Sequence, residues 1–249
     1  MYLTIQGLVL RVTGYNDTDA LLTVLTRDQG KLTVKARGLR RKNSPLTAPC
    51  QLLAYSEFTL FEYRGMYTIN EALSLELFQQ LHRDLLKLSL ATYFAQVAEV
   101  LSQEDQSTPE LLSLTLNSLY SLAKLHIPEV QIKAVFELRC ACLAGYTPDL
   151  GSCGQCGALT PGCFDISAGQ VECAECRNPD SAGIRMPLNN GCLEAMRYVC
   201  SCDAKQLFSF HIGEDSLRYF SQVAEAYLST QLERGFSTLD FYKTLLIDT

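Results

Sequence analysis

The chain has 249 residues, enough for one large domain or for two to three small ones. Apolar residues make up 47% of the chain, which is typical of a globular protein with a hydrophobic core and argues against intrinsic disorder. The net charge of −6 argues against a uniformly basic nucleic-acid-binding protein. The sequence shows no signal peptide and no apolar run of the roughly 18 residues that cross a bilayer, so we expect a soluble, intracellular protein.

Residues 1 to about 78 predict five β-strands. The first three runs of β-branched and aliphatic residues, 4–12, 20–26 and 31–36, are separated by the turn sequences Gly14-Tyr15-Asn16-Asp17 and Arg27-Asp28-Gln29-Gly30. Two further runs, 52–63 and 66–74, meet at Arg64-Gly65. Five strands in this length suit an OB-fold barrel, which binds oligonucleotides on one face, although the spacing also permits an SH3-like barrel.

A basic segment lies within this β-rich region. Between Gln29 and Ser56 there is no Asp or Glu, whereas six basic residues occur: Lys31, Lys35, Arg37, Arg40, Arg41 and Lys42. The first three occupy alternate positions on a predicted strand and thus one face, and the others continue into the next loop. We interpret this row as a DNA-binding groove that follows the phosphate backbone. The alternative is a solvated charged surface. Nearby aromatic residues that could stack on bases are Tyr15, Tyr55, Tyr63 and Tyr67.

From about residue 78 the pattern becomes helical. An apolar stripe runs to about residue 102, and Thr108-Pro109 and Pro128-Glu129 mark the starts of two further helices, the second ending at Gly145. Helical patterning returns over residues 189–202 and 214–245. We therefore predict an α+β protein in which these helices form one bundle.

Four cysteines predict a metal site. Cys153 and Cys156 form one C-x2-C pair, Cys173 and Cys176 form a second, and sixteen residues separate the pairs, as in a zinc ribbon. Four thiolates complete a tetrahedron and leave no open position, so we expect one structural Zn²⁺ per chain. The alternative is a redox-active C-x-x-C motif. The other seven of the eleven cysteines are expected to be free thiols, mostly packed in the core.

No catalytic set is recognisable in the sequence. The three histidines, His82, His126 and His211, belong to no metal or nucleophile motif, and no phosphate-binding loop or cluster of carboxylates is present. We predict that the protein is not an enzyme.

Segments along the whole chain resemble the bacterial RecO family. The matching stretches are Gly14-Tyr15-Asn16-Asp17-Thr18-Asp19, Leu22-Thr23-Val24-Leu25-Thr26, Gly30-Lys31, Ala36-Arg37-Gly38-Leu39-Arg40-Arg41, Phe136-Glu137-Leu138-Arg139, Gly145-Tyr146-Thr147-Pro148-Asp149-Leu150 and Cys153-x-x-Cys156-Gly157. The resemblance implies an OB-fold domain over residues 1–78, a helical domain over 79–150 and 181–249, and an inserted zinc module over 151–180.

The resemblance also implies a function. Such a protein would be a cytoplasmic, nucleoid-associated recombination mediator that binds single- and double-stranded DNA and anneals complementary strands. It would work with RecR to load RecA onto strands coated by single-stranded-DNA-binding protein, with RecF as a further candidate partner. By position on the central helix, Lys133 and Arg139 are candidate contacts for the tail of single-stranded-DNA-binding protein. The alternatives are an RNA-binding module and a protein-interaction scaffold.

Overall fold

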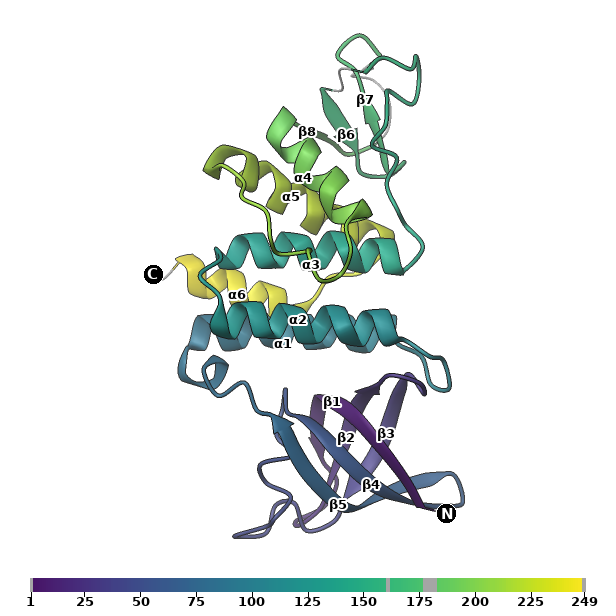
Figure 1. Cartoon of the computed structure of the whole chain (residues 1–249), viewed down its shortest axis with the longest axis vertical. Helices are drawn as coiled ribbons and strands as arrows, with labels where there is room; N and C mark the ends of the chain where they lie inside the picture. Colours follow the sequence, from purple (N-terminus) through teal and green to yellow (C-terminus); the bar gives the residue numbers. More distant parts are fainter. Residues whose placement is uncertain (1, 160–161, 177–182, 248–249) are drawn as a thin grey trace. The chain divides into compact units, whose positions relative to one another are not determined.

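The computed structural model describes residues 2–159, 162–176 and 183–247 (Figure 1). Its contacts divide the chain into two compact units, Met1–Leu125 with Phe236–Thr249, and His126–Gly235. The first unit contains a β-barrel with three helices, and the second contains three further helices with a small sheet. None of the helices in the described ranges combines the length and the apolar character needed to span a membrane.

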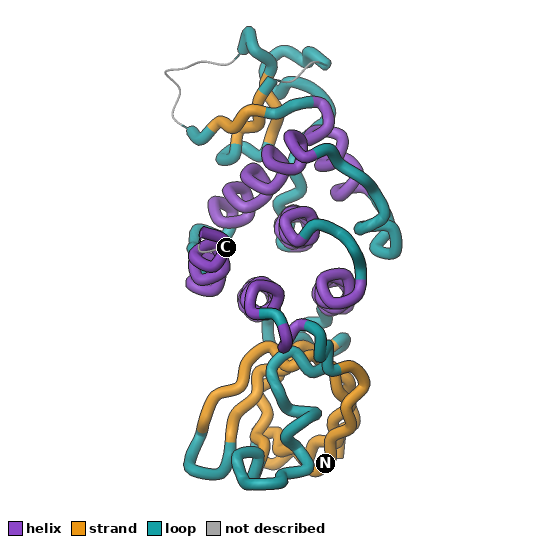
Figure 2. The backbone as a smooth tube through the Cα atoms, turned by 90° about the vertical axis from the view of Figure 1, so that its left-hand side faces the viewer, coloured by secondary structure: helices purple, strands orange, loops and turns teal. Residues whose placement is uncertain are grey.

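Five strands form the barrel of the first unit: β1 (Tyr2–Gly14), β2 (Ala20–Thr26), β3 (Lys31–Ala36), β4 (Tyr55–Tyr63) and β5 (Met66–Glu76). The strand order is β1-β2-β3-β5-β4, and pairing of β1 with β4 closes the barrel. β3 and β5 run parallel, whereas the other pairs are antiparallel. The strands curve around a common interior (Figure 2). This closed five-stranded barrel confirms the predicted OB-fold.

The long strand β1 pairs with two neighbouring strands. Its first half pairs with β4 and its second half with β2, and a register shift between Val9 and Arg11 accommodates the bend. Gly7 lies where the two pairings meet, and a Cβ at this position would collide with the Val24 side chain. Alternation along β4 directs Phe58 and Leu60 into the barrel core.

Three helices complete the first unit: α1 (Leu85–Leu101), α2 (Pro109–Lys124) and α6 (Ser237–Ile247). A 3₁₀ turn, η1 (Leu81–Arg83), precedes α1, and the Asp84 carboxylate caps α1 by accepting the Lys87 backbone N–H. Glu99 on α1 forms an ion pair of 2.9 Å with Arg11 of β1. α6 packs on α1, where the Phe236 ring meets Tyr93 edge-on.

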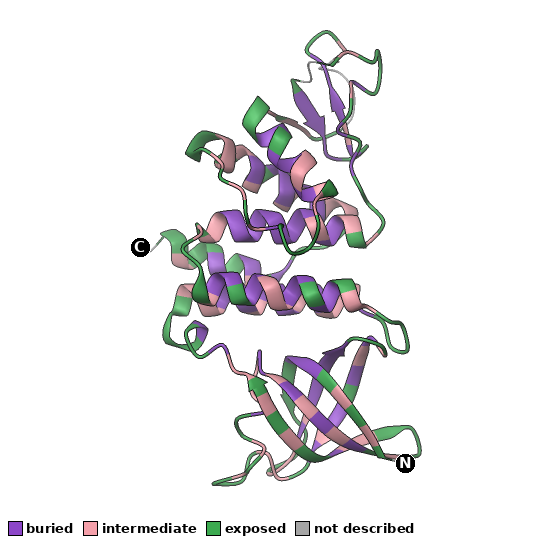
Figure 3. Cartoon of the chain, viewed as in Figure 1, coloured by how far each residue is buried: buried purple, intermediate pink, exposed green. Residues whose placement is uncertain are grey.

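The second unit is built around α3 (Glu129–Leu143). Most of α3 is buried, because α4 (Asn190–Ser201) and α5 (Glu214–Gln231) both pack against it (Figure 3). Three short strands, β6 (Cys163–Asp165), β7 (Gln170–Glu172) and β8 (Arg185–Pro187), form a sheet in the order β7-β6-β8 (Figure 1). The cysteine segments lie beside this sheet.

The helical part differs in grouping from the single bundle expected from the sequence. The contacts place α1, α2 and α6 with the barrel and α3, α4 and α5 with the small sheet. The segment expected to be helical over residues 214–245 contains two helices, because Glu233 adopts a φ of 50° just after α5 ends. The domain limits 1–78, 79–150 with 181–249, and 151–180 stay a prediction.

Candidate nucleic-acid interface and metal centre

Four exposed basic side chains follow β3. They lie on or beside a loop of successive turns over residues 37–54, and we call them the loop cations: Arg37, Arg40, Arg41 and Lys42. Backbone hydrogen bonds within the loop fix its conformation: the Arg41 N–H donates to the Gly38 carbonyl, and the Ser44 N–H donates to the Arg41 carbonyl. Cys50, which is fully buried, anchors the loop in the barrel core. The loop therefore presents several positive charges from a defined backbone.

Asp19 joins this loop to the turn between β1 and β2. Its carboxylate accepts the Gly38 backbone N–H at 2.9 Å and lies 3.2 Å from the Lys35 ammonium. These bonds, the Gly38 N–H foremost, hold the pKa of Asp19 well below its usual range. Arg40 adds a second connection, because its guanidinium donates to the Asn16 carbonyl at 3.0 Å. The carboxylate stays ionised at any neutral pH, so the loop remains tied to the turn.

The two predicted DNA-contacting lysines on β3 have partners within the chain. Lys31 donates to the Glu99 carbonyl in the last turn of α1 at 3.0 Å, and its side chain is half-buried. Lys35 pairs with Asp19 and lies 4.5 Å from the centre of the Tyr15 ring. The six predicted positions thus separate into four exposed cations, of which Arg40 also donates to a backbone carbonyl, and two half-buried lysines that bind protein groups.

Exposed aromatic rings accompany the loop cations on the barrel. Tyr15 and Tyr63 are more than half exposed, whereas Tyr55 and Tyr67 are half-buried. Tyr2 and Phe61, which the sequence reasoning missed, lie opposite each other on β1 and β4 with ring centres 5.4 Å apart. Their signal was the two-residue alternation of β4, which places positions 61 and 63 on the outer face. Such rings can stack on unpaired bases.

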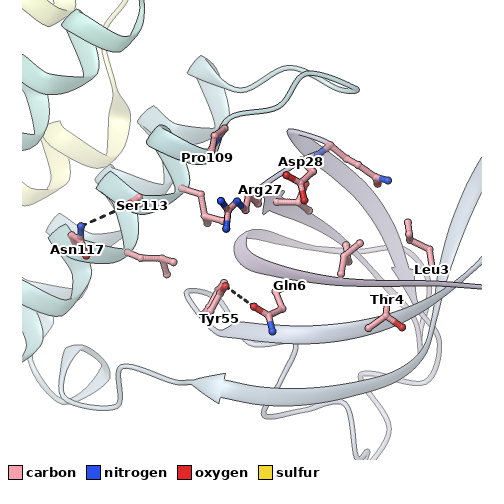
Figure 4. A pocket seen from close by; sticks show the side chains of 14 residues that line it. Leu3, Thr4, Gln6, Arg27, Asp28, Tyr55, Pro109, Ser113 and Asn117 are labelled. Carbon is pink, nitrogen blue, oxygen red and sulfur yellow. Dashed lines mark hydrogen bonds between the residues drawn. The ribbon is translucent and has the colours of Figure 1, made fainter. Parts of the chain in front are cut away.

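Among the concavities of the first unit, two are lined in part by β1. A groove of about 500 Å³ beside Arg40 has largely apolar walls, among them Val12, Leu39 and Leu52. A pocket of about 640 Å³ lies between the barrel and the first half of α2, where side chains of β1, the β2–β3 turn and α2 face one another (Figure 4). In this pocket the Tyr55 hydroxyl donates to Gln6 at 3.1 Å. The groove therefore adjoins one of the loop cations.

The four predicted metal ligands come together in the second unit. The Sγ atoms of Cys153, Cys156, Cys173 and Cys176 all lie within 4.8 Å of one another. Around a tetrahedral zinc ion, sulfur atoms about 2.3 Å from the metal would lie roughly 3.8 Å apart. The Cys156 and Cys173 sulfur atoms are separated by 3.6 Å. Within the described ranges this is the one group of three or more such side chains that converges enough to hold a metal ion.

The pKa values of two of the clustered thiols are shifted in opposite directions. Backbone N–H groups of Cys173, Cys156 and Gln155 lower the pKa of the Cys153 thiol to about 6. In contrast, hydrogen bonds shared with Cys156 and Cys173 raise the pKa of Cys176. Thiolates this close repel one another, so the four can ionise together only around a positive ion. Soft thiolate ligands in this arrangement fit zinc or iron.

A network of ion pairs supports the cysteine segments. Arg185 on β8 contacts Glu172 on β7 at 2.7 Å and Asp165 on β6 at 3.2 Å. Both carboxylates are buried, and Glu172 directly precedes the ligand Cys173. Cys163, between the two pairs, is buried with its sulfur 3.8 Å from the Glu172 carbonyl and lies outside the cluster.

Lys133 is buried inside the second unit, whereas Arg139 is only half-buried. Lys133 is 3% exposed, and its ammonium lies 3.0 Å from Glu137 and 2.8 Å from Glu225. Arg139 donates to the Val199 and Cys200 carbonyls at the end of α4. Both side chains hold helices together, and the contact of Lys133 and Arg139 with a partner stays a prediction.

Replacing Lys133 with methionine is expected to lower the free energy of unfolding by roughly 3–5 kcal/mol, because Glu137 would remain buried without its counter-ion. Burial works against the ammonium, but the two carboxylates outweigh it and raise the pKa of Lys133. The ion pair therefore persists at neutral pH, and the stability that the Lys133 charge contributes is lost as the pH rises through its raised pKa. Urea denaturation measures the change. The double variant Lys133→Met with Glu137→Leu should recover most of the lost free energy of unfolding. Equal losses in the single and the double variant would contradict the role of Lys133 as the counter-ion of Glu137.

Comparison with known proteins identifies the family. Family models described as the N-terminal and the C-terminal part of recombination protein O match residues 1–78 and 82–240. The DNA repair protein RecO of Acetivibrio thermocellus is 34% identical over 98% of this chain and 97% of its own length. Those of Desulforudis audaxviator and Alkaliphilus metalliredigens are 32% and 29% identical, with 98% of this chain and at least 97% of each relative covered. The chain therefore belongs to the RecO family of DNA repair proteins.

Proposed function

We propose that this protein is a non-enzymatic mediator of recombinational DNA repair that holds single- and double-stranded DNA on its barrel. The observation that carries the proposal is the group of four exposed loop cations on an acidic chain, with the exposed Tyr15 next to Asn16, whose carbonyl accepts from Arg40. Arginine and lysine side chains neutralise phosphates, and the rings and the apolar groove beside Arg40 accept unpaired bases. The printed names of the relatives, all DNA repair proteins, agree with this role.

Strand annealing follows from the same surface. Two strands that approach each other repel through their phosphates, and the loop cations reduce this repulsion when both strands are bound. Contacts to the backbone leave the base edges free to pair. A fluorescence assay with two complementary labelled oligonucleotides measures the effect, and unchanged annealing in the presence of the protein would contradict it.

The remaining steps of the proposed function concern partner proteins. With RecR, the protein would help RecA to load onto strands coated by single-stranded-DNA-binding protein, whose tail is a further binding partner, and RecF would act in the same process. The measurement is the lag before RecA hydrolyses ATP on coated strands. The protein together with RecR should shorten this lag, and neither protein alone should do so to the same extent.

We propose that the metal is one structural zinc ion per chain, held by Cys153, Cys156, Cys173 and Cys176. All four donors are thiolates and no fifth ligand is needed, so the ion would join two segments of the chain rather than take part in a reaction. Elemental analysis of the purified protein tests the metal's identity and its stoichiometry.

The salt dependence of binding to single-stranded DNA distinguishes the loop cations from the full basic segment. Four phosphate contacts predict a slope of about −2.8 in log K against log salt, whereas six contacts predict about −4.2. The smaller slope corresponds to roughly a 50-fold loss of affinity between 50 and 200 mM salt. Fluorescence anisotropy of a labelled oligonucleotide gives the slope. Stronger binding to RNA would favour an RNA-binding module, and no binding would favour a protein-interaction scaffold.

A further inference from the structure

Two cysteines outside the metal cluster meet between helices of the second unit. Cys142 lies one residue before the end of α3, and Cys200 lies one residue before the end of α4. Their sulfur atoms are 3.7 Å apart although 58 residues separate them in the sequence. Both thiols are half-buried, whereas Cys50, Cys140 and Cys192 are fully buried. A small oxidant can therefore reach this pair more easily than the core thiols.

Arg139 holds the two helix ends together. It lies on α3 one turn before Cys142, and its guanidinium donates to the Val199 and Cys200 carbonyls at 3.0 Å each. These two bonds secure the end of α4 against α3, so the distance between the two sulfur atoms is set by the packing of the helices. Other polar groups near the pair are the Thr147 hydroxyl, Cys202 and the Tyr227 hydroxyl.

The environment also favours a single reactive thiolate in the pair. The hydrogen bond with Cys200 outweighs burial and, with the positive charge of Arg139, lowers the pKa of Cys142 to about 7. The same hydrogen bond and burial raise the pKa of Cys200. With Arg139 one turn away, Cys142 is taken as the thiol that ionises first, and Cys200 as the thiol beside it that can complete a disulfide.

We propose that Cys142 and Cys200 are a reversible oxidation site that joins α3 to α4 through a disulfide when the protein meets a peroxide. The Cys142 thiolate attacks a peroxide oxygen of hydrogen peroxide, which breaks the O–O bond and leaves a sulfenic acid and, after protonation, water. The Cys200 sulfur, losing its proton, then attacks the sulfenic sulfur and expels a second water. Two thiols and one peroxide therefore give one disulfide and two waters, and a small dithiol reverses the step.

The geometry requires little movement. A disulfide has an S–S length of about 2.05 Å, so the sulfur atoms need to approach by roughly 1.7 Å, which rotation about the Cα–Cβ bonds can supply. The four clustered cysteines also lie close together, but thiolates bound to a metal ion are held in its coordination sphere. The zinc-loaded protein is therefore the form in which the Cys142–Cys200 pair should oxidise first.

Peptide mapping tests the proposal. The zinc-loaded full-length protein is treated with one equivalent of hydrogen peroxide, free thiols are blocked with iodoacetamide, and the digest is analysed by mass spectrometry. We expect the peptides containing Cys142 and Cys200 to be cross-linked while one zinc per chain is retained. The Cys200→Ser variant should instead accumulate a sulfenic acid on Cys142, which dimedone traps. As a matched control, Cys202→Ser should form the cross-link as the unaltered protein does.

A rate measurement gives a second, independent test. At pH 7 a thiol whose pKa is about 7 is half ionised, whereas a thiol with the ordinary pKa of 9.0 is about 1% ionised. A thiolate of lower pKa is also a weaker nucleophile, so Cys142 should react with iodoacetamide roughly five- to eightfold faster than the ordinary thiol. Iodoacetamide labelling of Cys142 in a Cys200→Ala variant should lose this advantage, because alanine has no group that can hydrogen-bond to the Cys142 sulfur. A cross-link that fails to form while zinc is retained, or equal labelling rates for Cys142 and Cys202 in the unaltered protein, would overturn the proposal.

Discussion

Exchange of Arg40 and Arg41 for glutamate is expected to weaken the binding of single-stranded DNA on the order of 60-fold at 50 mM salt, because two phosphate contacts are lost. Repulsion by the new carboxylates adds to this loss. The salt slope should fall by about 1.4, and annealing of complementary strands should fall to the rate without protein. Anisotropy and the annealing assay measure these changes. The metal cluster lies in the other unit, so its zinc content should stay the same.

A matched variant distinguishes the effect of where the charges lie from the effect of the net charge. Lys205→Glu with Arg218→Glu makes the same change in net charge, and both side chains are exposed on the second unit. We expect this variant to bind DNA within about twofold of the unaltered protein, because neither side chain belongs to the unit that carries the loop cations and salt screens exposed charges. Equal losses in the two variants would show that net charge, and not the loop, controls binding.

Replacement of Cys173 by serine is expected to remove the metal and to unfold the segment around the small sheet. Sites of this type contribute apparent binding free energies of about 10–16 kcal/mol, and the segment has few apolar side chains of its own to replace that contribution. Zinc per chain should fall from one to near zero. Amide hydrogen exchange over residues 153–176 should accelerate strongly, while the barrel amides keep their protection. Because only thiolates bind the ion, lowering the pH should release it from the unaltered protein as well.

The Cys202→Ser variant is the control for this experiment. Cys202 also lies in the second unit but is outside the cluster, so the variant should keep one zinc per chain. DNA binding by Cys173→Ser should remain within about twofold, because the loop cations belong to the first unit. A large loss of DNA binding in Cys173→Ser alone would mean that the metal module itself contacts DNA.

The barrel was predictable because its turns have distinctive sequences. β2 and β3 begin and end at the predicted residues, since Arg27-Asp28-Gln29-Gly30 permits only a turn between them and Gly30 has a φ of 63° there. β4 begins at Tyr55 rather than at residue 52, because residues 52–54 still belong to the loop and Leu53 adopts a φ of 66°. The three strands of the small sheet have three residues each, too few for alternation to reveal them.

The candidate sites differ in how far they could be predicted from the sequence. The four cysteines are paired at close spacing within one segment, so local sequence was enough to predict that they meet. Lys133 is different, because the carboxylate of Glu225 that helps to bury it lies 92 residues further along the chain. The pairing of Lys31 with α1 and the approach of Cys142 to Cys200 likewise depend on contacts between distant segments, which residue spacing does not encode.

The return of α6 to the first unit affects how the protein is made. Phe236 and Tyr242 are buried in that unit, with Phe236 against Tyr93 of α1, yet the ribosome adds them only after the whole second unit. At about 5–20 residues per second, roughly 110 residues of synthesis separate the two parts, a delay of about 6–22 s. During this interval the nascent α1 exposes an uncovered apolar surface, the kind of surface that chaperones bind.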